Sequence, residues 1–112
     1  MPGPEVTLHS LFDLRPGCTE SGFKAVYDAF AAHLRDEGFV VTWRTLRRLP
    51  HAGYDTDPPA SQFAADLVFT DRPAMLSAWD HVEADGPGVQ RVHRAVNRQV
   101  CNARFYLTET VD

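Results

Sequence analysis

The sequence has few cysteines and no long apolar run, and each shortage excludes a class of protein. No stretch approaches the roughly 20 apolar residues of a membrane-spanning helix, so no membrane partner is expected. The two cysteines, Cys18 and Cys101, lie far apart, which is typical of free thiols rather than of a disulfide framework. The first residues, MPGPEVTLHS, lack the basic and apolar segments of a secretory signal. These features predict a cytoplasmic protein.

A basic excess and the common cofactor motifs are also missing. Fifteen acidic residues outnumber eleven Lys and Arg residues, which gives a formal net charge of −4 and disfavours binding to nucleic acid. The chain has no glycine-rich phosphate loop and no nucleophile elbow. Its five histidines show neither the H-x₃-H nor the H-E-x-x-H spacing of metal sites. We therefore expect no nucleic-acid partner, no metal and no cofactor.

The sequence does contain one pattern twice: an apolar strand, a turn, an amphipathic helix and another strand. The first helix has Thr19 as its predicted N-cap and Gly38 as its stop. The second is interrupted at Gly86-Pro87-Gly88. This doubled unit predicts one ferredoxin-like α+β domain over residues 1–112, with a four-stranded antiparallel sheet and two helices on one face. The predicted strands are residues 6–14, 39–49, 62–70 and 100–109.

Between the two copies lies a segment that is too rich in turn residues for a tight hairpin. Residues 50–61 contain three prolines, one glycine and two aspartates, which is typical of a longer loop. If a ligand binds nearby, this loop is a candidate lid.

Alternation of side chains along the strands divides the sheet into two faces. One face is apolar and is predicted to pack on the helices; its members are Leu8, Ser10, Phe12, Phe63, Ala65, Leu67, Phe69, Cys101, Ala103, Phe105 and Leu107. In the second helix the predicted buried residues are Leu76, Trp79 and Val82. Trp43 lies on a strand with apolar residues on both faces, so its face stays open.

The other face of the sheet is mixed, with apolar residues beside a few charged ones. Its predicted members are His9, Leu11, Ala64, Asp66, Val68, Asn102, Arg104 and Tyr106. A face of this composition suits the wall of a pocket or a subunit interface. Because a two-fold partner would bury the same patch on both copies, we expect a homodimer.

His9 is the centre of the candidate site on this mixed face. In ferredoxin-like strand order the first strand lies between the third and fourth, which places His9 between Asp66 and the pair Arg104 and Tyr106. A carboxylate beside an imidazole fixes its tautomer and suits it to work as a general base. Arg104 and Tyr106 would then hold an anionic or enolate oxygen. The alternative is that the charged groups form an ion pair across a dimer interface, with His9 as a packed neighbour.

Four motifs resemble those of a small bacterial family of unknown function within the dimeric α/β-barrel superfamily. They are FDLRPG (12–17), WRTLRRL (43–49), DHV (80–82) and HRAVNRQVCNARFYL (93–107). The resemblance implies two ferredoxin-like subunits packed through their open sheet faces. More distant members of that superfamily include cofactor-independent monooxygenases, isomerases, polyketide cyclases and haem-binding proteins. Such an analogy concerns the fold, and it assigns no catalytic residue.

Two hypotheses about function therefore remain open. In the first, the protein is a cofactor-independent monooxygenase, isomerase or cyclase that acts on a small aromatic or polyketide-like anion. Its catalytic residues would be His9, Asp66, Arg104 and Tyr106. In the second, it is a non-catalytic binding or structural dimer, and the same residues only order the interface.

Overall fold

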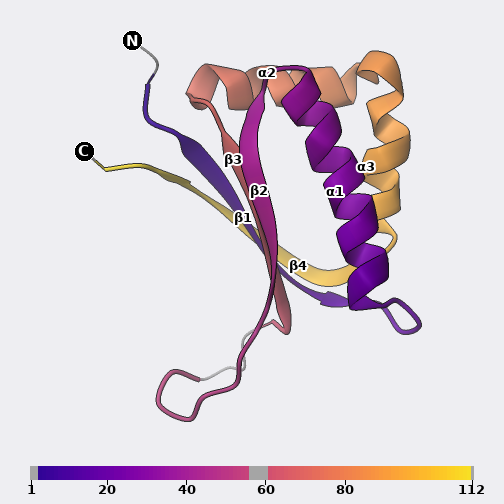
Figure 1. The fold of residues 1–112 in the computed structure, drawn as a ribbon, viewed down its shortest axis with the longest axis vertical. Coiled ribbons are helices and arrows are strands. Elements are labelled where there is room, and N and C mark those ends of the chain that lie inside the picture. Colours follow the sequence, from indigo (N-terminus) through magenta and orange to yellow (C-terminus); the bar gives the residue numbers. More distant parts are fainter. Residues whose placement is uncertain (1–2, 56–60, 112) are drawn as a thin grey trace.

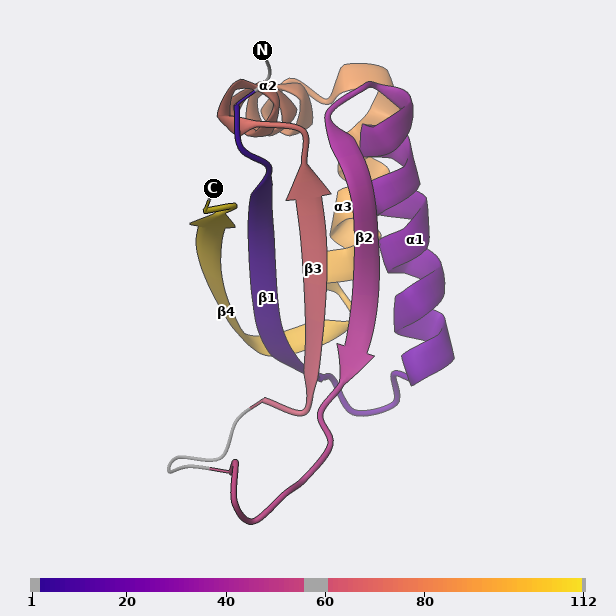
Figure 2. The ribbon, with the colours of Figure 1, turned by 60° about the vertical axis from the view of Figure 1, so that its left-hand side comes forward.

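The computed structural model describes residues 3–55 and 61–111 and has one sheet with its helices on one face (Figure 1). The sheet order is β2-β3-β1-β4, and every pairing is antiparallel (Figure 2). The predicted ferredoxin-like fold is confirmed, with β1 between β3 and β4. The strands are β1 (Val6–Leu14), β2 (Val40–Arg47), β3 (Phe63–Phe69) and β4 (Val100–Glu109). The helical segments are α1 (Glu20–Asp36), α2 (Arg72–Glu83), the short 3₁₀ turn η1 (Gly86–Gly88) and α3 (Val89–Asn97).

Helix α1 has the predicted start and stop. The Thr19 hydroxyl accepts a hydrogen bond from the Gly22 amide at 3.0 Å, which satisfies one of the free donors of the first turn. After the helix, Gly38 has a φ of 87°, a left-handed conformation that glycine adopts without a Cβ penalty. The buried side chains recur at helical spacing and face the sheet; they are Phe23, Tyr27, Phe30, Ala31 and Leu34.

The second half of the chain has two helices where one interrupted helix was predicted. Asp71 caps α2 by accepting a hydrogen bond from the Ala74 amide at 2.9 Å. The prediction that Leu76 is buried is wrong, because 54% of this residue is exposed and Met75 and Ala78 are buried in its place. Figures 1 and 2 show α2 at the end of the sheet. In this place the helix buries Met75, Ala78 and Val82 and leaves Leu76 outside the core.

An irregularity in β2 decides which face Trp43 occupies. A register shift at Val41 leaves this residue unpaired and reverses the alternation after it. Trp43 then lies opposite Leu67 on the helix side, and its indole N–H donates a hydrogen bond to the Asp28 carboxylate of α1 at 2.9 Å. The next residue, Arg44, is consequently on the face of the sheet away from the helices, here called the open face.

A second irregularity changes the predicted faces of β4. Asn102 has a φ of 54° at a register shift between β1 and β4, so two residues face one at this point. Cys101 therefore lies opposite Asp13 on the open face, and its predicted place against the helices is wrong. Phe105 is on the helix side as predicted, opposite Ser10, yet 63% of it is exposed.

The core lies between the sheet and the three helices. Its largest fully buried side chains are Phe69, Leu34, Leu67 and Val89. In residues 3–55 and 61–111, no helix combines the length and the apolar character that crossing a membrane requires. Residues 50–55, the start of the predicted 50–61 loop, project from the end of the sheet (Figure 1). Residues 56–60 lie outside the described residues, and a lid function stays a prediction.

His93 on α3 is a packed residue that should make the stability of the fold depend on pH. Its ring lies against Phe30, with 5.2 Å between the ring centroids. Burial lowers the pKa of His93 below its ordinary value of 6.5, because apolar surroundings disfavour the charged imidazolium. Since the pKa is lower in the folded chain, the unfolded chain binds the proton first as the pH falls.

The free energy of unfolding should therefore decrease as the pH is lowered from about 7.5 to about 5. A His93→Gln variant has no proton to gain at this position and should lose less stability over the same interval. Urea unfolding at both pH values measures the difference. The control is His51→Gln, in an exposed part of the loop, which should follow the wild type. Equal losses in the wild type and in His93→Gln would contradict this role of His93.

Candidate functional site

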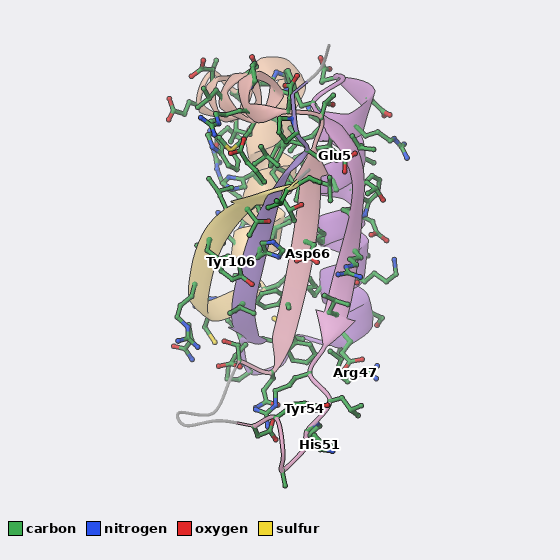
Figure 3. All side chains as sticks on the ribbon, turned by 90° about the vertical axis from the view of Figure 1, so that its left-hand side faces the viewer. Glu5, Arg47, His51, Tyr54, Asp66 and Tyr106 are labelled. Atoms are coloured by element: carbon green, nitrogen blue, oxygen red, sulfur yellow. The ribbon has the colours of Figure 1, made fainter. Side chains whose placement is uncertain are left out.

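A row of polar side chains crosses the open face of the sheet, with one residue from each strand. His9 of β1 lies opposite Asp66 of β3 on one side and opposite Tyr106 of β4 on the other. Arg44 of β2 lies opposite Asp66 from the far side. Directly paired residues share a face of the sheet. Figure 3 looks toward this face, and its labels mark Asp66 and Tyr106.

Asp66 joins the row together, because its two carboxylate oxygens have different partners. Oδ1 accepts a hydrogen bond from Nδ1 of His9 at 2.8 Å, and Oδ2 accepts one from Nε of Arg44 at 2.9 Å. Only 7% of Asp66 is exposed, and a charge buried to this extent requires such partners. The pKa of Tyr27 on α1 is raised, chiefly by burial and further by the negative charge of Asp66.

The partners of His9 fix both the orientation of the ring and its tautomer. An ionised carboxylate only accepts hydrogen bonds, so the proton between His9 and Asp66 belongs to Nδ1. In the neutral ring Nε2 is then the basic nitrogen, and it accepts a hydrogen bond from the Thr108 hydroxyl at 2.8 Å. Tyr106 stacks on the same ring, with 4.6 Å between the centroids and 16° between the planes.

This geometry is suited to proton transfer. A buried carboxylate that holds the imidazole by Nδ1–H leaves Nε2 as a base and stabilises the imidazolium that forms when Nε2 takes a proton. Thr108 is exposed, so an acidic group of a ligand that displaced its hydroxyl would meet Nε2 directly. If the row only formed a structural network of ion pairs, the Arg44–Asp66 contact would be sufficient, and a basic Nε2 on His9 would have no role.

The structure brings together three of the four predicted site residues, namely His9, Asp66 and Tyr106. Arg104 is on the same face but opposite Leu11, and it makes no hydrogen bond or ion pair with another described residue. Sequence reasoning missed Thr108, although alternation from Tyr106 places it on this face. It also missed Arg44, whose face depends on the irregularity at Val41.

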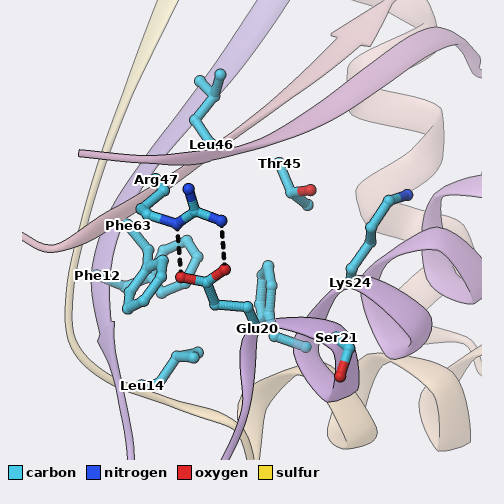
Figure 4. A pocket seen from close by; sticks show the side chains of 10 residues that line it. Phe12, Leu14, Glu20, Ser21, Lys24, Thr45, Leu46, Arg47 and Phe63 are labelled. Carbon is cyan, nitrogen blue, oxygen red and sulfur yellow. Dashed lines mark hydrogen bonds and ion pairs between the residues drawn. The ribbon is translucent and has the colours of Figure 1, made fainter. Parts of the chain in front are cut away.

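A pocket of about 390 Å³ lies on the opposite side of the sheet, between the start of α1 and the end of β2 (Figure 4). Arg47 and Glu20 form a two-fold hydrogen-bonded ion pair beside it, at 2.7 and 2.6 Å, and the hydrogen bond from Arg47 lowers the pKa of Glu20. The volume is within the range of small-molecule sites, about 300–1,000 Å³. The apolar residues of its lining are Phe12, Leu14, Phe23, Leu46 and Phe63. Because most of these residues are on the helix side, a ligand in this pocket would not reach His9.

Comparison with known proteins places the chain in a family. The model of the family of unknown function DUF6614 matches residues 6–109. The chain belongs to this family. No curated protein matches it. The predicted membership of a family without an assigned function is thereby confirmed.

Solved structures of low sequence identity share the fold of this DUF6614 protein. SnoaB, a cofactor-independent oxygenase from Streptomyces nogalater, is 20% identical with a TM-score of 0.68, covering 97% of this chain and 95% of SnoaB. The hydroxynitrile lyase from Passiflora edulis is 11% identical with a TM-score of 0.70, covering 99% and 97%. A dimeric ferredoxin-like protein of unknown function from Thermobifida fusca is 12% identical with a TM-score of 0.63, covering 96% and 92%. At these identities the likeness establishes the fold alone.

Proposed function

We propose that two copies of the chain pack their open sheet faces together. The open face exposes large apolar side chains on both edge strands, Leu46 of β2 and Tyr106 of β4. Exposed apolar surface of this extent favours a partner, and a two-fold copy covers it symmetrically. The dimeric relative from Thermobifida fusca supports the proposal.

Within this dimer the protein is a cofactor-independent enzyme that removes a proton from a small aromatic or polyketide-like anion. The observation that carries this proposal is the hydrogen-bonded pair of Asp66 and His9, in which Nε2 is hydrogen-bonded to the exposed hydroxyl of Thr108. Removing a proton from carbon leaves an electron-rich carbanion or enolate, which is the common first step of isomerisation, cyclisation and direct reaction with oxygen. One relative of the same fold is a cofactor-independent oxygenase, and this adds support.

Each residue of the row then has a separate task. His9 is the base, and Asp66 keeps its ring in position and stabilises the imidazolium. Tyr106 and Arg104 hold the anionic oxygen of the substrate, which reduces the cost of the negative charge that develops there. Arg44 is a positioning residue, because it acts on the reaction through Asp66.

A measurement of mass together with a ligand screen tests the proposal. Light scattering should give twice the chain mass of 12.5 kDa at micromolar protein. In a thermal-shift screen of aromatic acids and quinols, at least one compound should raise the melting temperature, because a ligand that binds only the folded state stabilises it by about 2.7 kcal/mol at 100 times its Kd. A monomeric mass combined with no stabilising compound would contradict the proposal.

A second candidate function, ligand binding without catalysis, is favoured by the apolar pocket beside Glu20 and Arg47. In that case the sheet face only joins the two copies, and the ligand lies on the helix side. A Thr45→Phe variant, which narrows this pocket, separates the two functions. It should abolish stabilisation by the ligand if the pocket is the binding site, and leave it unchanged if the ligand binds at His9.

A further inference from the structure

Two histidines that are 48 positions apart in the chain meet between α1 and α2, away from the row on the open face. The Nε2 atoms of His33 and His81 are 2.9 Å apart. Glu37 follows His33 by one helical turn, and one of its carboxylate oxygens joins them, with all three atoms within 4.8 Å of one another. Figures 1 and 2 show the C-terminal end of α1 next to α2.

We propose that His33, His81 and Glu37 bind one divalent transition-metal ion of the zinc type. Two imidazoles and one carboxylate form a ligand set that zinc accepts, with a fourth position left for water. With Zn–N bonds of about 2.0–2.1 Å, two nitrogen ligands of a tetrahedral ion lie about 3.3 Å apart. The two rings therefore need to separate only slightly, and the exposed side chain of Glu37 needs to move inward.

The surroundings hold His81 in the orientation that the site requires. A Cβ atom on Gly86 would clash with Nδ1 and Cε1 of the His81 ring, so the glycine backbone packs against the ring. The same ring makes an edge-to-face type of contact with Phe39, with 5.3 Å between the centroids. A ligand whose orientation is fixed before the metal arrives loses less freedom on binding.

The electrostatic environment also favours a cation. His33 lies in the last turn of α1, and His81 lies in the last turn of α2. The C-terminal ends of helices carry partial negative charge, and here two of them converge. The carboxylate of Glu37 adds a full negative charge. A bound metal would tie the end of α1 to α2 and stabilise their packing, and its role is separate from the proposed chemistry of His9.

Zinc titration of the full chain tests the site. It is carried out at about pH 7.5, a pH at which histidine is largely neutral and able to bind metal. We expect one zinc ion per chain by calorimetry, a rise in melting temperature with zinc, and tetrahedral d–d absorption when cobalt(II) replaces zinc. His33→Ala and His81→Ala should each lower the affinity by more than about 10–100-fold, the usual cost of losing only a second-sphere contact. Gly86→Ala, which displaces the ring but removes no ligand, should also weaken binding.

Three further variants keep the test decisive. Glu37 is exposed, so Glu37→Gln should fold normally. Its zinc affinity should nevertheless be lower than that of the wild type. His9→Ala and His51→Ala remove histidines elsewhere and should bind zinc as the wild type does. The proposal is overturned if no stoichiometric zinc binds at micromolar concentration. It is equally overturned if His33→Ala and His81→Ala both retain wild-type zinc affinity, or if His9→Ala loses zinc affinity.

Discussion

Replacing His9 by glutamine is expected to slow proton removal from a bound ligand by about 10²–10⁴-fold. Glutamine is close to histidine in size and can still donate a hydrogen bond to Asp66, but it has no basic nitrogen. The Asp66–His9 contact of 2.8 Å would then be replaced by one that supports no proton transfer. The sheet, the dimer and the affinity for the ligand should be little changed.

Deuterium exchange measures this step without knowledge of the full reaction. A ligand found by thermal shift is incubated with the protein in D₂O, and NMR follows the loss of its most acidic C–H signal. The control is His51→Gln, an exposed histidine outside the row, which should exchange at the wild-type rate. If His9→Gln exchanges as fast as the wild type while it binds the ligand normally, His9 is not the base.

Leu34→Ala should produce a large loss of stability. Leu34 is fully buried, at 0% exposure, between α1 and the sheet. Removing a buried leucine side chain costs about 2–5 kcal/mol, because transfer energy is lost and a cavity remains. A domain of this size is stable by about 5–15 kcal/mol, so the melting temperature should fall by on the order of 10 °C.

The matched control for Leu34→Ala is the same substitution at Leu76 on α2, where 54% of the residue is exposed. Both sites are helical, and alanine favours helix at either, so the difference between the variants reports packing. Leu76→Ala should change the free energy of unfolding by about 0.5 kcal/mol or less. Urea unfolding of both variants measures this difference. Equal losses would mean that Leu34 is not buried between α1 and the sheet or that Leu76 is not exposed.

The elements of the fold were predictable because their signals are local. Thr19 and Gly38 bound α1 as expected, since a cap and a left-handed stop depend only on neighbouring residues. The pairing of His9 with Asp66 was also predictable, because strand order and alternation together determine it. The buried stripe of α2 was not, because Leu76 and Met75 both suit a helix core and only the placement of α2 selects one.

Of the two site residues that escaped prediction, Thr108 follows from simple alternation from Tyr106, whereas the face of Arg44 depends on an irregularity that alternation does not reveal. One extra residue at Val41 turns Arg44 to the open face, and another at Asn102 turns Cys101 to it. Neither residue type signals such a shift by itself. His33 and His81 were beyond reach for another reason, since their contact is made by tertiary packing of two helices and leaves no spacing in the sequence.

Nitrogen-resolved NMR of the His9 ring in mildly alkaline solution tests the central claim most directly. A long-range ¹H–¹⁵N correlation should show a protonated Nδ1 and an unprotonated Nε2, as the bond to Asp66 requires. Addition of a ligand found by thermal shift should then move the Nε2 signal as the Thr108 hydroxyl is displaced. A protonated Nε2, or a His9 ring that does not respond while Thr45 and Phe63 of the pocket do, would contradict the assignment of the chemistry to the open face.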